Sequence, residues 1–307
     1  MAIDFSKKHD TLIYYEDGSL IPMDIPHYEV KQIADNTWQI ASSGDYHYLV
    51  VGDEEGIAID TGYGAGDLRE YLEELCGKPV RSVINTHYHF DHSANNSYFH
   101  TVYVSAVDAP KACQVWMYPS FEGVDVPRDY DEVIVGTGSI VPLKGRDLEI
   151  FEIGDHTPGG IAILDRKERI LFTGDEFMGF GKMLNGTVEN WLAGLERLMA
   201  VRDQFDVIAG GPAVIDAQIV DDFYEAAKKI LAGERSEMPK MGGPHKGPEL
   251  PVVEGHKVYH WKDPHPEDRP GARPQDKKDG TVDPRGAGKP DMECLLYKNY
   301  RFMFKNR

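Results

Sequence analysis

Short runs of apolar, β-branched residues alternate with stretches of helical periodicity between Tyr28 and Gly233. This alternation is typical of a layered α/β fold. Two hairpins are predicted near its start, one turning at Asp35 and Asn36 and the other at residues 53–56, DEEG. Because consecutive hairpins make neighbouring strands antiparallel, we expect the sheet to be at least partly antiparallel.

The segments of helical periodicity each carry one apolar stripe. Helices are predicted at 67–77, where Gly77 ends the pattern, at 187–205, where Thr187 is a suitable N-cap, and at 216–233. The buried strands expected between them are 79–85, 146–154, 160–165, 169–175 and 205–211. Repeated strand, loop and helix units predict a sandwich with helices outside and loops that meet at one rim.

The two ends of the chain differ in composition from this central part. We expect residues 1–27 to pack on the body as an N-terminal segment and residues 28–233 to form the main domain. Residues 234–307 form a Pro/Gly-rich extension, since ten of the 19 prolines lie in its first 60 residues. Two stretches in it, at 252–261 and 293–304, are apolar enough to form strands, so the extension is predicted to wrap around the domain.

Charge and cysteine content narrow the classes of function and compartment. The chain holds 51 acidic against 33 basic residues, a formal charge of −18, which disfavours nucleic acid and anionic membrane surfaces as partners. Cys76, Cys113 and Cys294 form no CxxC pair, as expected in a reducing compartment. With neither a signal-like N-terminus nor an apolar run of about 18 residues, the expected location is cytoplasmic.

The candidate chemistry lies in THYHFDH, residues 86–92, directly after a predicted buried strand. His87 and His89 are two residues apart, so in an extended segment both imidazoles point the same way and can bind one cation. Asp91 and His92 then turn the chain and can serve a second cation. Imidazole and carboxylate ligands favour zinc, and iron or manganese also accept them.

Four motifs together resemble those of the metallo-β-lactamase fold superfamily. In chain order they are IAIDTG at 57–62, THYHFDH at 86–92, GDHTPGG at 154–160 and FTGDEF at 172–177. The resemblance extends from about Tyr28 to Gly233. It implies a four-layer αββα sandwich, to which this chain adds the Pro/Gly-rich extension.

The same resemblance implies a role for each site residue. It places the first metal ion on His87, His89 and His156. Asp91 and His92 contribute to a second ion, and Asp175 bridges the two. Asp60 is implied to support the metal-binding loop from behind rather than to ligate.

One position departs from the family pattern. A last metal-binding histidine is expected at the end of a strand, where this chain reads DVIAGGPAV and Gly210 aligns with it. The second ion is therefore short of one ligand, which water or another side chain could replace, or a single ion is bound. The extension supplies further histidines, which we interpret as ordinary surface residues: His245, His256, His260 and His265.

These residues predict a zinc-dependent hydrolase of a small molecule. A metal-bound hydroxide would cleave an ester, thioester, lactone or amide, while Asp91 orients the water and moves its proton. One alternative is a mononuclear iron oxygenase of the persulfide dioxygenase type, with iron on His87, His156 and Asp175. Another is a non-catalytic ligand-binding member of the fold. Whether the chain forms a homo-oligomer is left open.

The stretch after Asp175 suggests a substrate-binding surface. Phe177, Met178 and Phe180 alternate with glycines there, so an apolar lip at the metal site is one interpretation and ordinary core packing is the other. A second candidate wall lies at 114–127, with core packing again the alternative. The sequence does not identify the substrate.

Overall fold

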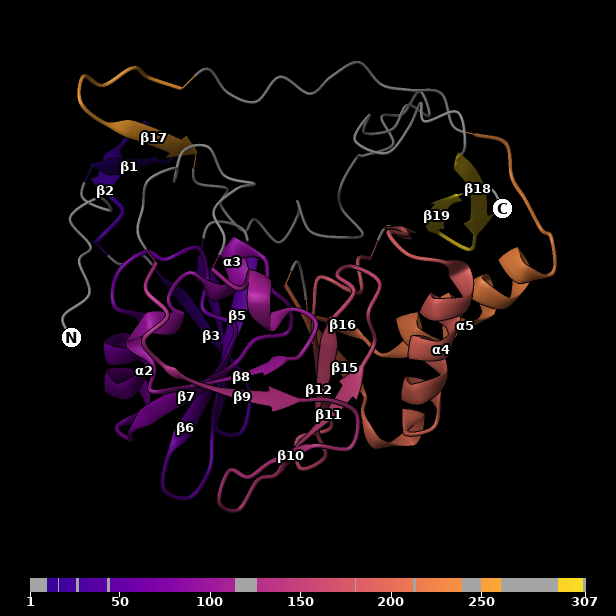
Figure 1. The fold of residues 1–307 in the computed structure, drawn as a ribbon, viewed down its shortest axis with the longest axis horizontal. Helices are drawn as coiled ribbons and strands as arrows, with labels where there is room; N and C mark the ends of the chain where they lie inside the picture. Colours follow the sequence, from indigo (N-terminus) through magenta and orange to yellow (C-terminus); the bar gives the residue numbers. More distant parts are fainter. Residues whose placement is uncertain are drawn as a thin grey trace.

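The computed structural model describes residues 10–15, 17–25, 28–42, 45–113, 126–179, 181–211, 214–238, 250–260 and 292–305. Its body is a sandwich of two sheets with helices on the outer faces (Figure 1). This is the four-layer αββα arrangement that the sequence predicted.

The first sheet has seven strands in chain order. They are β3 (Glu29–Ala34), β4 (Thr37–Ser42), β5 (Asp45–Val51), β6 (Gly56–Ile59), β7 (Val80–Ile84), β8 (Thr101–Ser105) and β9 (Asp131–Val135). Strands β3 to β6 are antiparallel, as the two predicted hairpins require, and β6 to β9 are parallel. Because β6, β7 and β8 are parallel, the loops that follow them leave from the same edge of the sheet.

The second sheet has six strands. They are β10 (Ile140–Val141), β11 (Leu148–Glu152), β12 (Ile161–Asp165), β13 (Ile170–Gly174), β15 (Val207–Gly210) and β16 (Val214–Asp216). β13 and β15 are parallel, so the residues after both strands also lie at one edge. Tyr48, Ile84, Ile163 and Phe172 belong to the apolar layer that joins the two sheets.

Helices cover the outer faces. α2 (Leu68–Cys76) packs on the first sheet, and α4 (Val188–Met199) and α5 (Gln218–Leu231) pack on the second. Gly77 ends α2 in the left-handed conformation at φ 67°, and the Thr187 hydroxyl accepts the backbone N–H of Asn190 at 3.2 Å. Both predicted helix ends are confirmed. None of the helices in the described ranges is long and apolar enough to cross a membrane.

The shorter elements complete the body. They are α3 (Phe90–Ser93) and the 3₁₀ turns η1 (Asn96–Tyr98), η2 (Ala109–Lys111) and η4 (Arg202–Gln204).

Two small sheets hold the ends of the chain. One contains β17 (Lys257–His260), β1 (Thr11–Tyr14) and β2 (Leu20–Pro22); the other contains β14 (Gly181–Met183), β19 (Tyr300–Lys305) and β18 (Met292–Tyr297). Ile13 and Met23 belong to the same buried apolar cluster as Phe90 of the THYHFDH segment. Phe302 lies in the core of the second sheet and its helices, with its ring 4.9 Å from that of Phe223.

His47, on β5, is a buried histidine whose ring nitrogens have no hydrogen-bond partner among the described residues. Its ring meets that of Tyr28 edge-on at 6.0 Å. Burial, with a smaller contribution from His92, lowers the pKa of His47 from 6.5 to about 3. The folded protein therefore keeps this imidazole neutral at pH values where the unfolded chain protonates it.

His47 is expected to make the protein less stable in mild acid. When the pH falls from 7 to 5, His47 becomes protonated in the unfolded state but stays neutral in the folded state. This difference lowers the free energy of unfolding by about 2 kcal/mol. The free energy of unfolding of His47→Leu should therefore fall by about 2 kcal/mol less than that of the parent between pH 7 and pH 5. Urea unfolding at both pH values, in excess chelator, measures this difference. Between pH 7 and pH 8 the two proteins should change alike, and an unaltered acid dependence in the variant would contradict the expectation.

Candidate functional site

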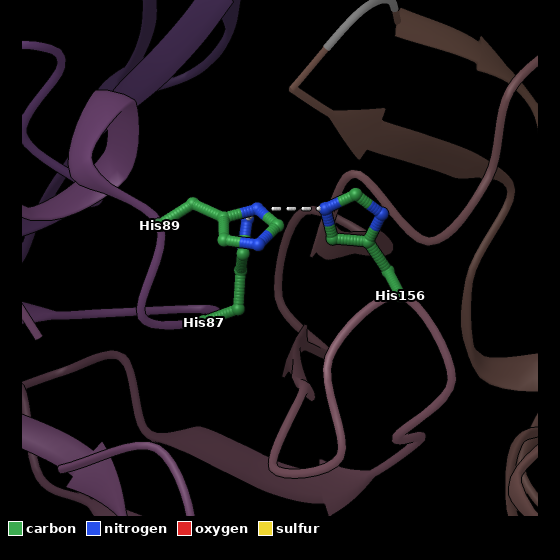
Figure 2. A group of neighbouring side chains, drawn as sticks. All are labelled: His87, His89 and His156. Carbon is green, nitrogen blue, oxygen red and sulfur yellow. Dashed lines mark hydrogen bonds between the residues drawn. The ribbon is translucent and has the colours of Figure 1, made fainter. Parts of the chain in front are cut away.

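The motif residues meet where the strand ends of the two sheets converge. The first sheet supplies Asp60 after β6 and the THYHFDH segment after β7. The second supplies His156 from the loop between β11 and β12, and Asp175 directly after β13. Figure 2 shows the imidazoles of His87, His89 and His156 converging from two separate loops.

The three imidazoles present one nitrogen each to a common point. His89 Nδ1 lies 3.0 Å from His87 Nε2 and 3.0 Å from His156 Nε2. Nitrogen ligands of a tetrahedral zinc ion, bound at 2.0–2.1 Å, stand about 3.3 Å apart. The spacing therefore suits one ion bound by all three rings, and these residues form one of the groups of possible metal ligands within the described ranges.

Burial keeps these rings in the form that binds metal. Burial, with the neighbouring histidines, holds the pKa of His87 well below its ordinary value. Burial also lowers the pKa of His89 and brings that of His156 to about 3. Because metal ions bind neutral imidazole, the lone pairs are available near neutral pH without prior loss of a proton.

Asp60 orients two of the histidines from behind. Its carboxylate accepts the Thr86 N–H and the Thr86 hydroxyl, both at 2.7 Å, and the hydroxyl lies 3.0 Å from His87 Nδ1. Asp60 Oδ2 also lies 2.9 Å from His92 Nδ1. With both Nδ1 atoms held, the Nε2 atoms of His87 and His92 face the site, the arrangement expected of a supporting carboxylate.

Beside the three-histidine group lies a second set of donors. Asp175 Oδ1 is 3.5 Å from His92 Nε2, and Asp175 Oδ2 is 3.8 Å from His156 Nε2. Burial alone would lower the pKa of His92, but Asp175, Asp60 and Asp91 raise it well above its ordinary value. His92 correspondingly lowers the pKa of Asp175, against the effect of burial. Without metal, the two side chains form an ion pair.

Three buried polar atoms here have no hydrogen-bond partner among the described residues: Asp91 Oδ1, His92 Nε2 and Asp175 Oδ1. Buried polar atoms without hydrogen-bond partners are costly, so the presence of three of them in this part of the site fits a binding site for a cation. The second group of possible ligands with donor atoms within 4.8 Å is Asp60, His87 and His92, which includes neither Asp91 nor Asp175. Since the oxygens of Asp60 are already engaged, we interpret that residue as a support.

Gly211, the residue after Gly210, faces the second set of donors. The Gly210 carbonyl accepts the Tyr48 hydroxyl at 2.6 Å. A Cβ added to Gly211, in contrast, would lie 2.0 Å from Asp175 Oδ1 and 3.0 Å from His92 Cε1. A side chain at residue 211 would therefore point into the second set of donors, but glycine provides no side chain at this position.

A buried lysine beneath the His156 loop was not anticipated from the sequence. Lys182 Nζ lies 2.9 Å from Glu176 Oε1 and 3.2 Å from Asp155 Oδ2. Although burial alone would lower the pKa of Lys182, Glu176 and Asp155 raise it, so the charge is retained. Glu176 Oε2 also accepts the His156 N–H at 3.0 Å. The only signal in the sequence was a single lysine within the apolar stretch FMGFGKML.

The predicted apolar lip is corrected in part. Phe177 is 1% exposed, and its ring packs 5.3 Å from that of Phe223 under the helices, so it is a core residue. Met178 is half-buried, and its contact with substrate stays a prediction. Phe180 and residues 114–125 of the second candidate wall lie outside the described residues.

An αββα sandwich with candidate histidine and aspartate ligands at its strand ends is typical of a class of metal-binding proteins. The family model of the metallo-beta-lactamase superfamily matches residues 46–236. The chain belongs to this superfamily.

Among curated proteins, the chain is similar to the human acyl-coenzyme A thioesterase MBLAC2, with 28% identity over 176 residues, which cover 47% of this chain and 60% of that protein. Hydroxyacylglutathione hydrolase of Pelagibacter ubique is 27% identical over 170 residues, covering 54% of this chain and 66% of that protein. The chain thus spans about two thirds or less of both relatives. A solved metallo-beta-lactamase from Pontibacter korlensis aligns with a TM-score of 0.51 and 19% identity, covering 66% of this chain and 99% of that one, which supports the fold.

Proposed function

We propose that this protein is a metal-dependent hydrolase of small-molecule thioesters. The observation that carries the proposal is the convergence of one buried imidazole, that of His87, and two partly buried ones, in which His89 Nδ1 lies 3.0 Å from the Nε2 atoms of both His87 and His156. The Asp175 carboxylate and the His92 imidazole, 3.5 Å apart, extend this group toward a second ion. The two curated relatives support it, because both names describe the hydrolysis of an acyl group from a thiol-bearing carrier.

Each side chain has a defined task in this proposal. His87, His89 and His156 would hold the first ion, while Asp175 and His92 face a second. When bound, zinc supplies an acidified water and draws charge from a substrate carbonyl. Asp91, whose buried Oδ1 has no hydrogen-bond partner among the described residues, would orient that water and accept its proton.

A thioester suits this set of residues better than an amide. An alkyl thiol has a pKa of about 8.5, so a thiolate departs from a tetrahedral intermediate without being protonated. An amine leaving group needs a proton donor at the site. The imidazoles of His87 and His156 are neutral and would face the proposed ion, so the proton for an amine would have to come from Asp91 after it has accepted one from the water.

Zinc is the metal that fits the donors best, because three imidazole nitrogens converge. The competing mononuclear iron site would use two histidines and one carboxylate. His89, however, lies as close to both of its histidine neighbours as a full ligand would. The empty position at Gly211 is compatible with one ion or with two.

Metal content and turnover test the proposal together. Protein purified without added metal is analysed for zinc, iron and manganese, then assayed for thiol release from acyl-coenzyme A and acyl-glutathione esters. We expect one or two zinc ions per chain and thiol release that a chelator stops and zinc restores. One iron per chain with oxygen uptake on a persulfide, or metal-loaded protein that cleaves none of the thioesters, would overturn the proposal.

A further inference from the structure

Asp108 is a fully buried carboxylate in contact with both loops that carry the three histidines. Asp108 Oδ2 accepts the backbone N–H of Tyr88 at 3.2 Å and the Thr157 hydroxyl at 2.5 Å. Asp108 Oδ1 accepts the backbone N–H of Gly159 at 3.0 Å. One carboxylate therefore holds groups from residues 88 and 157–159 at once.

The two loops reach Asp108 from different sheets. Tyr88 lies between His87 and His89 on the loop after β7 of the first sheet. Thr157 directly follows His156 on the loop between β11 and β12 of the second sheet. The contacts with Asp108 thus bind the immediate neighbours of all three histidines to one group.

The fit around this carboxylate is tight. A Cβ added to Gly159 would lie 2.4 Å from Ser105 Oγ and 2.5 Å from Asp108 Oδ1, so the loop approaches this closely only as glycine. The Ser105 hydroxyl in turn accepts the Asp108 N–H at 3.2 Å. The position of the carboxylate is fixed by its own backbone as well as by the loops.

We infer that Asp108 is a positioning residue that sets the separation of His156 from His87 and His89, and thereby the affinity for the first metal ion. Its partners at Tyr88, Thr157 and Gly159 are all hydrogen-bond donors, which only a group with acceptors on both sides satisfies. Hydrogen bonds to an ionised carboxylate are also shorter and stronger than neutral ones. The inference concerns metal binding and does not depend on the proposed substrate.

Asp108→Asn is the direct test. The amide keeps one acceptor but places an NH₂ group against donors, so the loops must separate. Zinc affinity is measured by competition with a chromophoric chelator, well below the melting temperature, and cobalt(II) spectra report the ligand geometry. We expect the Kd for the first ion to rise roughly 10- to 100-fold, as when other groups that orient metal ligands are lost, with an altered cobalt spectrum.

Asp165→Asn is the matched control. Asp165 is equally buried, at the far end of β12, where Arg146 Nε donates to it at 2.7 Å. This variant should lose stability while its zinc Kd and cobalt spectrum stay those of the parent. Equal weakening of zinc binding in both variants, or a parental Kd in Asp108→Asn, would refute the inference.

Thr157→Val keeps the test decisive if Asp108→Asn does not fold. It removes one donor to Asp108 and leaves the carboxylate in place, so the zinc Kd should rise about 5-fold, the effect of one net hydrogen bond. A zinc Kd unchanged in Thr157→Val would count against Asp108 as a positioning residue.

Discussion

Replacing His89 with alanine is expected to abolish metal binding at the first site and, with it, hydrolysis. His89 Nδ1 is the nitrogen that lies 3.0 Å from the Nε2 atoms of both other candidate ligands, so its removal leaves only two of the three imidazole donors. The loss should exceed about 100-fold in metal affinity and in turnover, the upper limit for losing a group that merely orients a ligand. Metal stoichiometry after dialysis and thiol release from an acyl-coenzyme A ester measure the two effects.

The fold should survive this change. His89 is only partly buried and lies in the loop that leads into α3, so circular dichroism should match the parent protein. His256→Ala, at an exposed histidine of the C-terminal extension, serves as the control and should retain both metal and activity. Parental turnover in His89→Ala would remove the three-histidine site from the proposed chemistry.

Adding a single methyl group at Gly211 is expected to disable the second set of donors. The new Cβ would lie 2.0 Å from Asp175 Oδ1, well inside contact distance, so the Asp175 carboxylate must rotate away from His92. We expect Gly211→Ala to lower turnover by roughly 10- to 100-fold, the range seen when the groups around a metal are misplaced. Metal titration by calorimetry should show a weakened or missing second binding event.

Gly136→Ala is the appropriate control for that methyl group. Its added Cβ would meet the Glu152 side chain at 3.6 Å, an ordinary van der Waals contact with a residue outside the candidate site. This variant should keep parental turnover and metal titration. Should Gly211→Ala behave in the same way, residue 211 would not face the site.

The sequence predicted the parts of the site that are local in the chain. His87, His89 and His92 lie within one turn, and the strand before them is marked by its own apolar run. His156 and Asp175 were assigned by resemblance, and the structure brings both to the same place. In each case a short segment contains the whole signal, because a strand end fixes the direction of the side chains that follow.

Contacts between distant segments could not be predicted in this way. Glu176 and Lys182 differ from surface charges only by what covers them, and burial depends on the packing of α4, α5 and the C-terminal strands. The direction in which Gly211 faces also depends on such contacts, because its distance from Asp175 follows from the pairing of β15 with β13.

Phe177 is a further residue whose burial could not be predicted from the sequence. Its neighbours in the sequence suggested an exposed lip, but the chain turns after Asp175 and carries the ring under the helices. Hydrophobicity alone does not separate a residue that contacts substrate from one that fills the interior.

The donors come from both halves of the sandwich: His87 and His89 leave the first sheet, whereas His156 and Asp175 leave the second. An ion held by all of them would link two layers that meet mainly through apolar packing, with a few hydrogen bonds such as that of the Tyr48 hydroxyl to the Gly210 carbonyl. Such a link would join His89 and His156, which lie nearly 70 residues apart in the chain, much as a covalent cross-link would. Removing the metal would therefore weaken the contact between the two sheets as well as stop the proposed hydrolysis.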